Sequence, residues 1–326
     1  MSLKIVYPEY ELNEVSQKAM GGTEMMQKAL YERLPTDLLD QFQIICSRVR
    51  EIDPDKPSIL WLHDTHDDPE SQHLKDVEAR TRFKKLVFVS NYQMVTYMMA
   101  HGIQYGESTI MKNAIEPIEY HTKPDDGKIN LIYHTTPHRG LALLLNVFNE
   151  LVKTNEDIHL DVYSSFTIYG WDDKDAEFDT LFDFCREHDQ ITYHGGQPNS
   201  VVREALKKAH IFAYPSVWPE TSCISMIEAM SAGVMPVCPR FAALPETTAG
   251  FALDYPWTED GKAHMQVFYH ALNLAIGFAR ECFIEKTNDA VSQKLNFQKY
   301  YADTFYGWDL RAAEWTHFLK SLQEKP

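Results

Sequence analysis

The sequence predicts an α/β protein made of two doubly wound parallel sheets. Short runs of β-branched and aromatic residues alternate with longer segments of helical period, which is typical of parallel strands covered by helices. The chain has 326 residues, of which 44% are hydrophobic, enough for two domains that each bury a core. A polar, turn-rich segment at 121–127 separates two such series of strands and helices. This segment therefore predicts the domain boundary.

The first series predicts an N-terminal Rossmann-like domain over 1–122. Its expected strands are short apolar runs at 4–7, 43–46, 59–63, 86–90 and 109–112. A Gly, Ser or Asn near the end of a strand commonly opens the next helix. We therefore expect helices at 24–34, after Gly21-Gly22-Thr23, and at 92–101, after Ser90-Asn91.

The second series predicts a C-terminal domain over 128–300. Its expected strands are 129–133, 159–163, 191–194, 211–214 and 235–238, and its expected helices are 140–153, 176–188, 200–209 and 222–232. The last hundred residues are mostly helical and carry more aromatic side chains than one face of a small sheet needs. We therefore expect the end of the chain, 301–326, to contain a helix at 310–322 that crosses back onto the first domain.

Composition excludes several classes of protein. The 31 Lys and Arg residues against 47 Asp and Glu residues give a net charge of −16, which disfavours a general nucleic-acid coat. Five widely spaced cysteines without a C-x-x-C pair argue against a disulfide framework and a zinc knuckle. No apolar run approaches the length of a membrane helix, and Pro8 and Glu9 interrupt the apolar start. We expect a cytoplasmic protein, located in the host cytoplasm if it is viral.

The strongest chemical pattern is a pair of carboxylates eight positions apart, Glu220 and Glu228. In open α/β sheets, ligands bind beyond the carboxyl ends of the strands, so two facing sheets predict a cleft lined by these loops. If a helix begins near Thr221, its free amides and dipole offer a site for a diphosphate between the two carboxylates. Alternatively, Glu220 favours the helix dipole and Glu228 is a buried, paired residue. Spacing alone does not decide between these two interpretations.

The same block resembles retaining glycosyltransferases of GT-B family 4, the glycosyl transferases group 1, whose pattern is P-S-x-x-E-x(7)-E-A-M-x-x-G. The matching residues are Pro215, Ser216, Glu220, Glu228, Ala229, Met230 and Gly233, with one additional residue before Glu220. The resemblance implies that Glu220 contacts the donor sugar and that Glu228 holds the ribose. Thr221 stands where the family has glycine, and the amides of Ser222 and Cys223 are expected to complete the pyrophosphate site.

A second segment that resembles the family contains a candidate cation for the donor phosphates. The segment from Tyr133 to Gly140 is similar to the family's G-R-x-x-x-x-K-G, with Arg139 at the phosphate-binding Lys and His134 at the earlier Arg. A fixed guanidinium offsets negative charge on a leaving diphosphate without a metal. Taken alone, an arginine at position 139 is more often an ordinary surface residue than a ligand-binding one.

Two segments of the first domain complete the resemblance. Gly21-Gly22 is similar to the glycine loop that lets backbone approach the donor, and His63, at a strand end, matches a His that family members place near the reacting sugar. The dense run His63-Asp64-Thr65-His66-Asp67-Asp68 has a rival interpretation as the metal centre of a phosphoesterase. Its spacing fits no ordered metal site, so no metal is expected.

The resemblance therefore implies a retaining GT-B glycosyltransferase, with two Rossmann-like domains facing a cleft. The enzyme is expected to move a hexosyl or pentosyl group from a nucleotide diphosphate sugar, a UDP- or GDP-sugar, to an acceptor hydroxyl without a cofactor. The chain looks most like phage and other microbial members, which leaves a glycan or a hydroxymethylated base of phage DNA as acceptor. An alternative of another class is a nucleotide-sugar-binding protein without turnover, in which Thr221 and His134 reflect lost catalysis.

Overall fold

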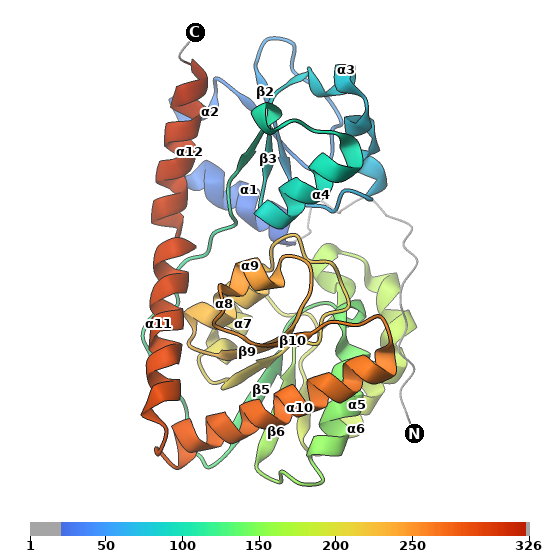
Figure 1. Cartoon of the computed structure of the whole chain (residues 1–326), viewed down its shortest axis with the longest axis vertical. Helices are drawn as coiled ribbons and strands as arrows, with labels where there is room; N and C mark the ends of the chain where they lie inside the picture. Colours follow the sequence, from blue (N-terminus) through green and yellow to red (C-terminus); the bar gives the residue numbers. More distant parts are fainter. Residues whose placement is uncertain (1–20, 324–326) are drawn as a thin grey trace. The chain divides into compact units, whose positions relative to one another are not determined.

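The computed structural model describes residues 21–323, which fold as two compact α/β units (Figure 1). The N-terminal unit comprises Gly21–Glu116, Pro219–Ile224 and the chain from Thr304 onward, and the C-terminal unit comprises Pro117–Trp218 and Ser225–Asp303. Each unit is built on a parallel sheet, as the alternation of strands and helices predicts. The predicted strand 4–7 lies outside the described residues.

The N-terminal unit contains a four-stranded parallel sheet in the order β1-β2-β3-β4. The strands are β1 (Gln43–Cys46), β2 (Ser58–Leu62), β3 (Phe83–Phe88) and β4 (Ser108–Ile110). The helices are α1 (Gly22–Arg33), α2 (Thr36–Leu39), α3 (Val77–Arg80), α4 (Asn91–His101) and α12 (Trp308–Gln323), with 3-10 turns η1 (Pro69–Lys75) and η2 (Tyr105–Glu107). Strand β1 has the predicted bounds, whereas the other strands differ from the prediction at their ends.

Both faces of this sheet are buried, because successive side chains of a strand point to opposite sides. In β2, Ile59 and Trp61 join the apolar cluster that includes helices α1 and α12, whereas Leu60 joins the cluster beneath α4. The Trp61 ring lies 4.9 Å from the fully buried Trp315 of α12. Figure 1 shows α12 beside α1 and α2 in this unit. The final helix is therefore part of the N-terminal core.

The C-terminal unit contains a six-stranded parallel sheet in the order β10-β9-β8-β5-β6-β7. The strands are β5 (Ile129–Tyr133), β6 (Ile158–Val162), β7 (Ile191–Tyr193), β8 (Ile211–Ala213), β9 (Met235–Arg240) and β10 (Leu253–Pro256). The α-helices are α5 (Leu141–Leu151), α6 (Asp179–Glu187), α7 (Asn199–Leu206), α8 (Ile224–Ser231), α9 (Leu244–Thr248), α10 (Gly261–Ala279) and α11 (Asp289–Phe305). The 3-10 turns η3 (Pro137–Arg139), η4 (Phe166–Tyr169) and η5 (Asp172–Phe178) and the π-turn η6 (Arg280–Ile284) complete it.

The strand order of this unit reverses at β5. From β5 the chain proceeds to β6 and β7 on one side and then to β8, β9 and β10 on the other, which is the doubly wound order of a Rossmann fold. The loops that leave β5 and β8 turn to opposite faces of the sheet and open a crevice between them. The topology thus singles out the loops after Tyr133 and Ala213 as a ligand site.

Several features differ from the sequence-based expectation. The expected helix 222–232 begins at Ile224, so Ser222 and Cys223 lie in the preceding loop, and strand β10 was not predicted. The expected helix 176–188 begins as a 3-10 turn and becomes α-helical at Asp179. Segment 117–122 groups with the C-terminal unit rather than with the first domain, because the Ile118 amide donates to Ser231 Oγ (2.8 Å).

Candidate functional site

The loops after β5 and β8 contact each other through main-chain atoms. Gly140 has φ of +130°, and a Cβ atom there would overlap the carbonyl oxygen of Pro215. Beyond this contact, the amide of Val217 donates to the carbonyl of Arg139 (3.2 Å). Only glycine tolerates both the backbone angle and the close approach. The two loops at the reversal point of the sheet therefore form one connected structure.

Arg139 supplies a fixed positive charge in the loop after β5. Its Nε donates to Thr136 Oγ1 (3.1 Å), and its guanidinium carbon lies 5.5 Å from the centre of the Trp218 ring. The hydrogen bond and the cation-π contact both restrict the side chain. Because a guanidinium remains protonated at every physiological pH, this group can meet a phosphate at the carboxyl ends of β5 and β8.

His134, which the resemblance aligns with the family's other cation, is a neutral ring. Its Nε2 donates to the carbonyl of Ser225 (3.1 Å), and its ring lies 4.4 Å from that of Phe212. Burial lowers the pKa of His134 to about 4, and the bond to Ser225 offsets this only in part. At neutral pH the matched pair therefore carries one positive charge, on Arg139, rather than two.

Glu228 is buried and paired. It lies on α8, is 4% exposed, and accepts hydrogen bonds from Arg203 (3.0 Å) and from the amide of Asn199 (3.0 and 3.1 Å). Burial raises the pKa of Glu228, while Arg203 and Asn199 oppose that shift. The sequence analysis missed both partners. Their spacing of four residues on α7, which puts them on one helix face, is the available signal.

Aromatic rings gather where β6 and β7 end. Tyr163 follows β6 and stacks on His194, which follows β7, with ring centres 4.1 Å apart and planes at 3°. Nε2 of His194 lies 2.7 Å from a carboxylate oxygen of Asp161 on β6. The sequence analysis placed these residues only at strand ends. Their stacking required the parallel pairing of β6 with β7.

The segment Pro219–Ile224 belongs to the N-terminal unit, although the sequence analysis placed it inside the second domain. The Thr221 hydroxyl donates to the carbonyl of His63 (2.6 Å), and Ile224 packs against the core of that unit. A Cβ atom on Gly22 would lie 3.0 Å from Cδ1 of Ile224, which explains why a residue without a side chain opens α1. These contacts attach the segment to the N-terminal core.

The predicted site residues thus fall into two groups. One group lies within the N-terminal unit and contains Gly21, Gly22, His63, Glu220, Thr221, Ser222 and Cys223; the other lies within the C-terminal unit and contains Arg139 and Glu228. Glu220 is 5% exposed and Cys223 is 3% exposed. Burial lowers the pKa of His63 to about 3, and an interaction with the backbone of Trp61 offsets this only in part. His63 is therefore a neutral imidazole beside the Thr221 segment.

The acidic run after His63 has a structural role. Asp68 caps η1, because its carboxylate accepts a hydrogen bond from the amide of Glu70 (2.8 Å). Burial raises the pKa of Asp64. In the described part of the chain, no three His, Cys, Asp or Glu side chains are grouped in a way that could hold a metal ion. Among the same residues, no helix is long and apolar enough to span a membrane.

Comparison with known proteins identifies related chains. Residues 116–249, about two fifths of the chain, match the profile of the family described as "Glycosyl transferases group 1". A phosphatidylinositol N-acetylglucosaminyltransferase subunit of Homo sapiens is 25% identical over 142 residues, which are 42% of this chain and 28% of that protein. The alignment thus covers less than a third of the length of this curated relative.

Solved structures resemble the chain over most of its length. A glycosyltransferase from Rickettsia africae ESF-5 has a TM-score of 0.66 at 13% identity, covering 97% of this chain and 85% of that chain. Anabaena Alr3699/HepE, solved in complex with UDP and glucose, has a TM-score of 0.63 at 14% identity, covering 82% and 72%. The chain therefore has the GT-B fold, and the segment 116–249 that matches the group 1 profile contains Arg139 and Glu228.

Proposed function

We propose that the chain is a retaining glycosyltransferase that moves a sugar from a nucleotide diphosphate sugar to an acceptor hydroxyl without a metal ion. The match to group 1 glycosyltransferases supports transfer of a glycosyl group, since the matched residues include Arg139, Glu220 and Glu228. A UDP donor is supported by the fold shared with a protein that binds UDP and glucose. Family 4 membership, the phage-like character and the acceptor remain predictions.

One observation carries this proposal: Arg139, which follows β5, and Glu228, on the helix α8 that follows β8, both belong to the C-terminal unit, whose strand order reverses between β5 and β8. A fixed guanidinium beyond the carboxyl end of a parallel strand favours a diphosphate. Further along α8, Glu228 offers carboxylate oxygens to ribose hydroxyls. Burial raises the pKa of this carboxyl, and the hydrogen bonds from Arg203 and Asn199 oppose that shift. Glu228 can therefore be both a buried, paired residue and the group that binds the ribose of the donor.

The proposed reaction proceeds on one face of the sugar. The acceptor hydroxyl oxygen bonds to the anomeric carbon on the face from which the diphosphate departs, as the bond from that carbon to the diphosphate oxygen breaks. The hydroxyl proton passes to the departing diphosphate, and the configuration at the anomeric carbon is retained. Arg139 and the amides before α8, those of Ser222 and Cys223, stabilise the negative charge on the leaving group. Glu220 orients the sugar, and the neutral ring of His63 hydrogen-bonds to one of its hydroxyls. No carboxylate is assigned as a nucleophile, because no pattern in the sequence resembles the paired carboxylates of a glycosidase.

Donor binding is tested by thermal unfolding with UDP, GDP, ADP and CDP, each with and without EDTA. A ligand at 100 times its dissociation constant stabilises the folded state by about 2.7 kcal/mol. We expect one nucleotide to raise the melting temperature equally in both conditions. If no nucleotide does so, or if the shift requires a metal, the Arg139 and Glu228 loops are not a working donor site of the proposed kind.

Catalysis is tested with Glu220→Gln and Arg139→Met. The Met variant removes the charge that meets the leaving diphosphate, and we expect it to lower kcat/KM by about 10²–10³. We expect Glu220→Gln to lower kcat while nucleotide binding persists, because Glu220 is assigned to the sugar. Glu150→Gln, an exposed carboxylate on α5, is the matched control. Donor hydrolysis or transfer that is unaffected by Glu220→Gln would favour the nucleotide-sugar-binding protein without turnover.

A glycan is the acceptor class that we propose. A base-modifying enzyme must hold nucleic-acid phosphates and extract the base, which requires clustered cations, whereas this chain carries a net charge of −16. We expect no salt-sensitive binding to duplex or single-stranded DNA in a gel-shift titration. Binding that weakens steeply between 50 and 200 mM salt, about tenfold or more, would instead favour the hydroxymethylated base.

A further inference from the structure

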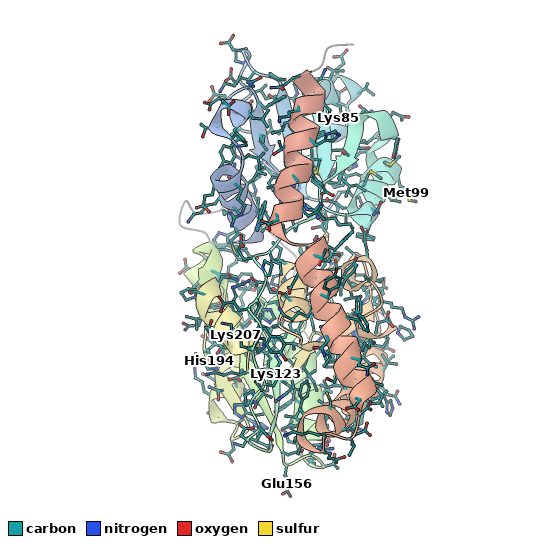
Figure 2. The ribbon with its side chains drawn as sticks, turned by 90° about the vertical axis from the view of Figure 1, so that its left-hand side faces the viewer. Lys85, Met99, Lys123, Glu156, His194 and Lys207 are labelled. Carbon is teal, nitrogen blue, oxygen red and sulfur yellow. The ribbon has the colours of Figure 1, made fainter. Side chains whose placement is uncertain are left out.

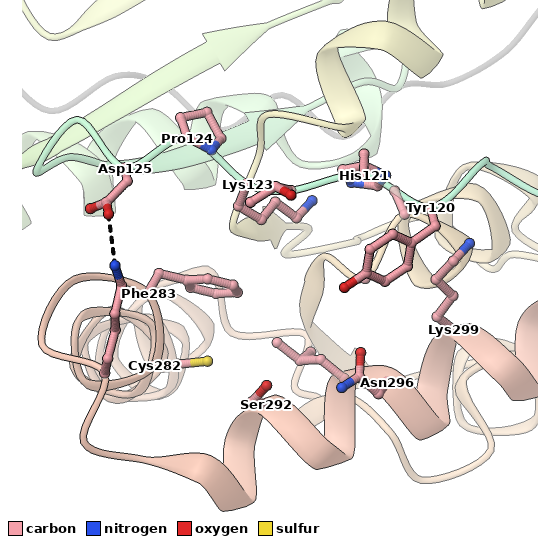
Figure 3. A pocket seen from close by; sticks show the side chains of 15 residues that line it. Tyr120, His121, Lys123, Pro124, Asp125, Cys282, Phe283, Ser292, Asn296 and Lys299 are labelled. Atoms are coloured by element: carbon pink, nitrogen blue, oxygen red, sulfur yellow. Dashed lines mark hydrogen bonds and ion pairs between the residues drawn. The ribbon is translucent and has the colours of Figure 1, made fainter.

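A separate cavity of about 300 Å³ lies in the C-terminal unit, and Figure 3 shows it from close by. One wall is the linker that leads into β5, with Tyr120, His121 and Lys123. The opposite wall is α11, with Ser292, Asn296 and Lys299. The linker precedes β5, so the cavity lies at the amino-terminal end of this strand. The loops after β5 and β8, which carry the proposed donor site, leave the carboxyl ends of these strands. The cavity is therefore a second, distinct location.

The walls of the cavity are fixed to each other by Lys299. Its ammonium donates to the carbonyl of Ile118, to the carbonyl of Ser231 (2.8 Å) and to the carboxylate of Asp303 (2.9 Å). These three acceptors use all three of its N–H donors. Lys299 therefore holds the linker, the end of α8 and α11 together and has no donor left for a ligand.

Lys123 lies in the same cavity with most of its donors unused. Its ammonium donates to the carbonyl of Leu206 (2.9 Å), and the described residues place no carboxylate within ion-pair distance of it. Two of its three N–H donors are therefore available. Lys286, at the rim, differs because its ammonium pairs with Asp125 (2.7 Å). Figure 3 shows Lys123 on the linker wall, opposite Ser292 and Asn296, and marks the ion pair of Asp125.

The charges around Lys123 are mostly positive. Burial and the neighbouring charge of Lys299 lower the pKa of Lys123 to about 7. Burial lowers the pKa of His121, and the positive charges of Lys123, Lys299 and Lys207 add to that effect. Burial also lowers the pKa of His210, to about 4. Figure 2 shows Lys123 and Lys207 on the same side of this unit.

The nearby acidic groups do not neutralise Lys123. Asp303 is bonded to Lys299 and Asp125 to Lys286, while Asp126 acts on His210. A chain with a net charge of −16 thus gathers several cations around one cavity. An ammonium that is removed from water and left without a counter-ion is unfavourable, and an anion in the cavity would remove that penalty.

We propose that this cavity binds a phosphate group, with the Lys123 ammonium as the cationic contact and the side chains of Ser292 and Asn296 as neutral donors. A volume of about 300 Å³ is at the lower end of the range for small-molecule sites, so a phosphorylated metabolite fits as well as free phosphate. The cavity lies between the linker, which begins after the unit boundary at Glu116, and α11, which contains the unit boundary at Asp303.

The test is a calorimetric titration of the full chain in phosphate-free buffer, with inorganic phosphate in one arm and glycerol 3-phosphate in the other. We expect saturable binding that weakens by about tenfold or more in Lys123→Met. Lys123→Arg, which keeps the charge, and Lys294→Met, which removes an exposed charge from α11 outside the cavity, should both bind as the unaltered chain does.

A second measurement covers the case in which Lys123→Met does not fold. Limited acetylation of the unaltered chain near pH 7, read by mass spectrometry, should label Lys123 before Lys294, and phosphate should slow the labelling of Lys123 alone. The arm with tighter binding identifies the source of the phosphate. Absence of saturable binding in both arms, or labelling that phosphate does not change, overturns the proposal. Neither result depends on whether the donor loops bind UDP.

Discussion

At the scale of single residues, burial decides which of the candidate groups carry charge. His134 and His63 both lose their protonated form because their rings are removed from water, whereas Arg139 keeps its charge. The family pattern has two cations at the positions of His134 and Arg139. In this chain the two matched positions hold one permanent cation, Arg139, and a neutral ring, His134, that bonds to the carbonyl of Ser225.

The buried state of His134 makes stability depend on pH. A histidine whose folded pKa is about 4, against an ordinary value of 6.5, stabilises the fold above 6.5, and that contribution is lost as the pH falls toward 4. The full loss corresponds to about 3 kcal/mol. In His134→Gln, which cannot be protonated, we expect this part of the acid-induced loss to be absent. Urea unfolding at pH 7, 5.5 and 4.2 measures the difference.

The other buried histidines titrate in both proteins, so their contribution cancels in this comparison. The unfolding free energies of the two proteins should approach each other by about 3 kcal/mol as the pH falls. Curves that stay parallel over the whole range would show that His134 is protonated equally easily in the folded and unfolded chains.

At the scale of elements, the loops after β5 and β8 depend on one glycine. Gly140 follows η3, has φ of +130° and faces the carbonyl of Pro215, so it joins the loop after β5 to the loop after β8. The bond from Val217 to the carbonyl of Arg139 continues this contact. The position of Arg139 relative to Trp218 therefore rests on a main-chain approach that any side chain at 140 would prevent.

We expect Gly140→Ala to destabilise the chain by about 2–4 kcal/mol and to weaken nucleotide binding, because the Cβ atom must displace Pro215. Gly127→Ala is the matched control. Gly127 also has a positive φ, of +74°, but nothing lies within 4 Å of its Cβ position. We expect Gly127→Ala to lower the free energy of unfolding by about 1–2 kcal/mol and to leave nucleotide binding unchanged. Denaturant titration and calorimetry with UDP measure both quantities, and equal losses in the two variants would contradict the packing argument.

At the scale of the whole molecule, the N-terminal unit is completed by the end of the chain. Ile115 pairs with Gly307 as an isolated bridge, and its carbonyl accepts from the amide of Trp308 (3.2 Å). Trp308, Trp315, Phe318 and Leu319 of α12 share one apolar cluster with residues of α1 and β2. Folding of this unit therefore requires contacts between residues about 200 or more positions apart, which are slow to form.

Trp315→Ala should lower the unfolding free energy by about 3–5 kcal/mol, because it empties space in a fully buried part of that cluster. Phe297→Ala removes an aromatic ring that is 67% exposed on α11 and should change stability by less than about 0.5 kcal/mol. Chemical denaturation followed by circular dichroism checks both. Similar effects of the two substitutions would mean that α12 does not contribute to the core as its burial indicates.

Much of the fold could be predicted because local patterns specify it. The bounds 43–46 and 129–133 were predicted as the structure has them, since short β-branched runs between turn residues leave few alternatives. Strand β10 (Leu253–Pro256) was missed because its alternation is weak and it contains a proline. The start of α8 at Ile224 was missed by two residues, because Thr221 bonds to His63 instead of capping the helix.

What the sequence by itself determined is the alternation that makes two parallel sheets and the spacing of Glu220 and Glu228, because both are properties of neighbouring positions. Only the tertiary structure decided the pairing of Glu228 with Arg203 and Asn199, the neutrality of His134 and the assignment of Pro219–Ile224 to the N-terminal unit. It alone brought Lys123 and Lys299 to one cavity. Burial and charge depend on residues distant in sequence, so they are defined only once the chain has folded.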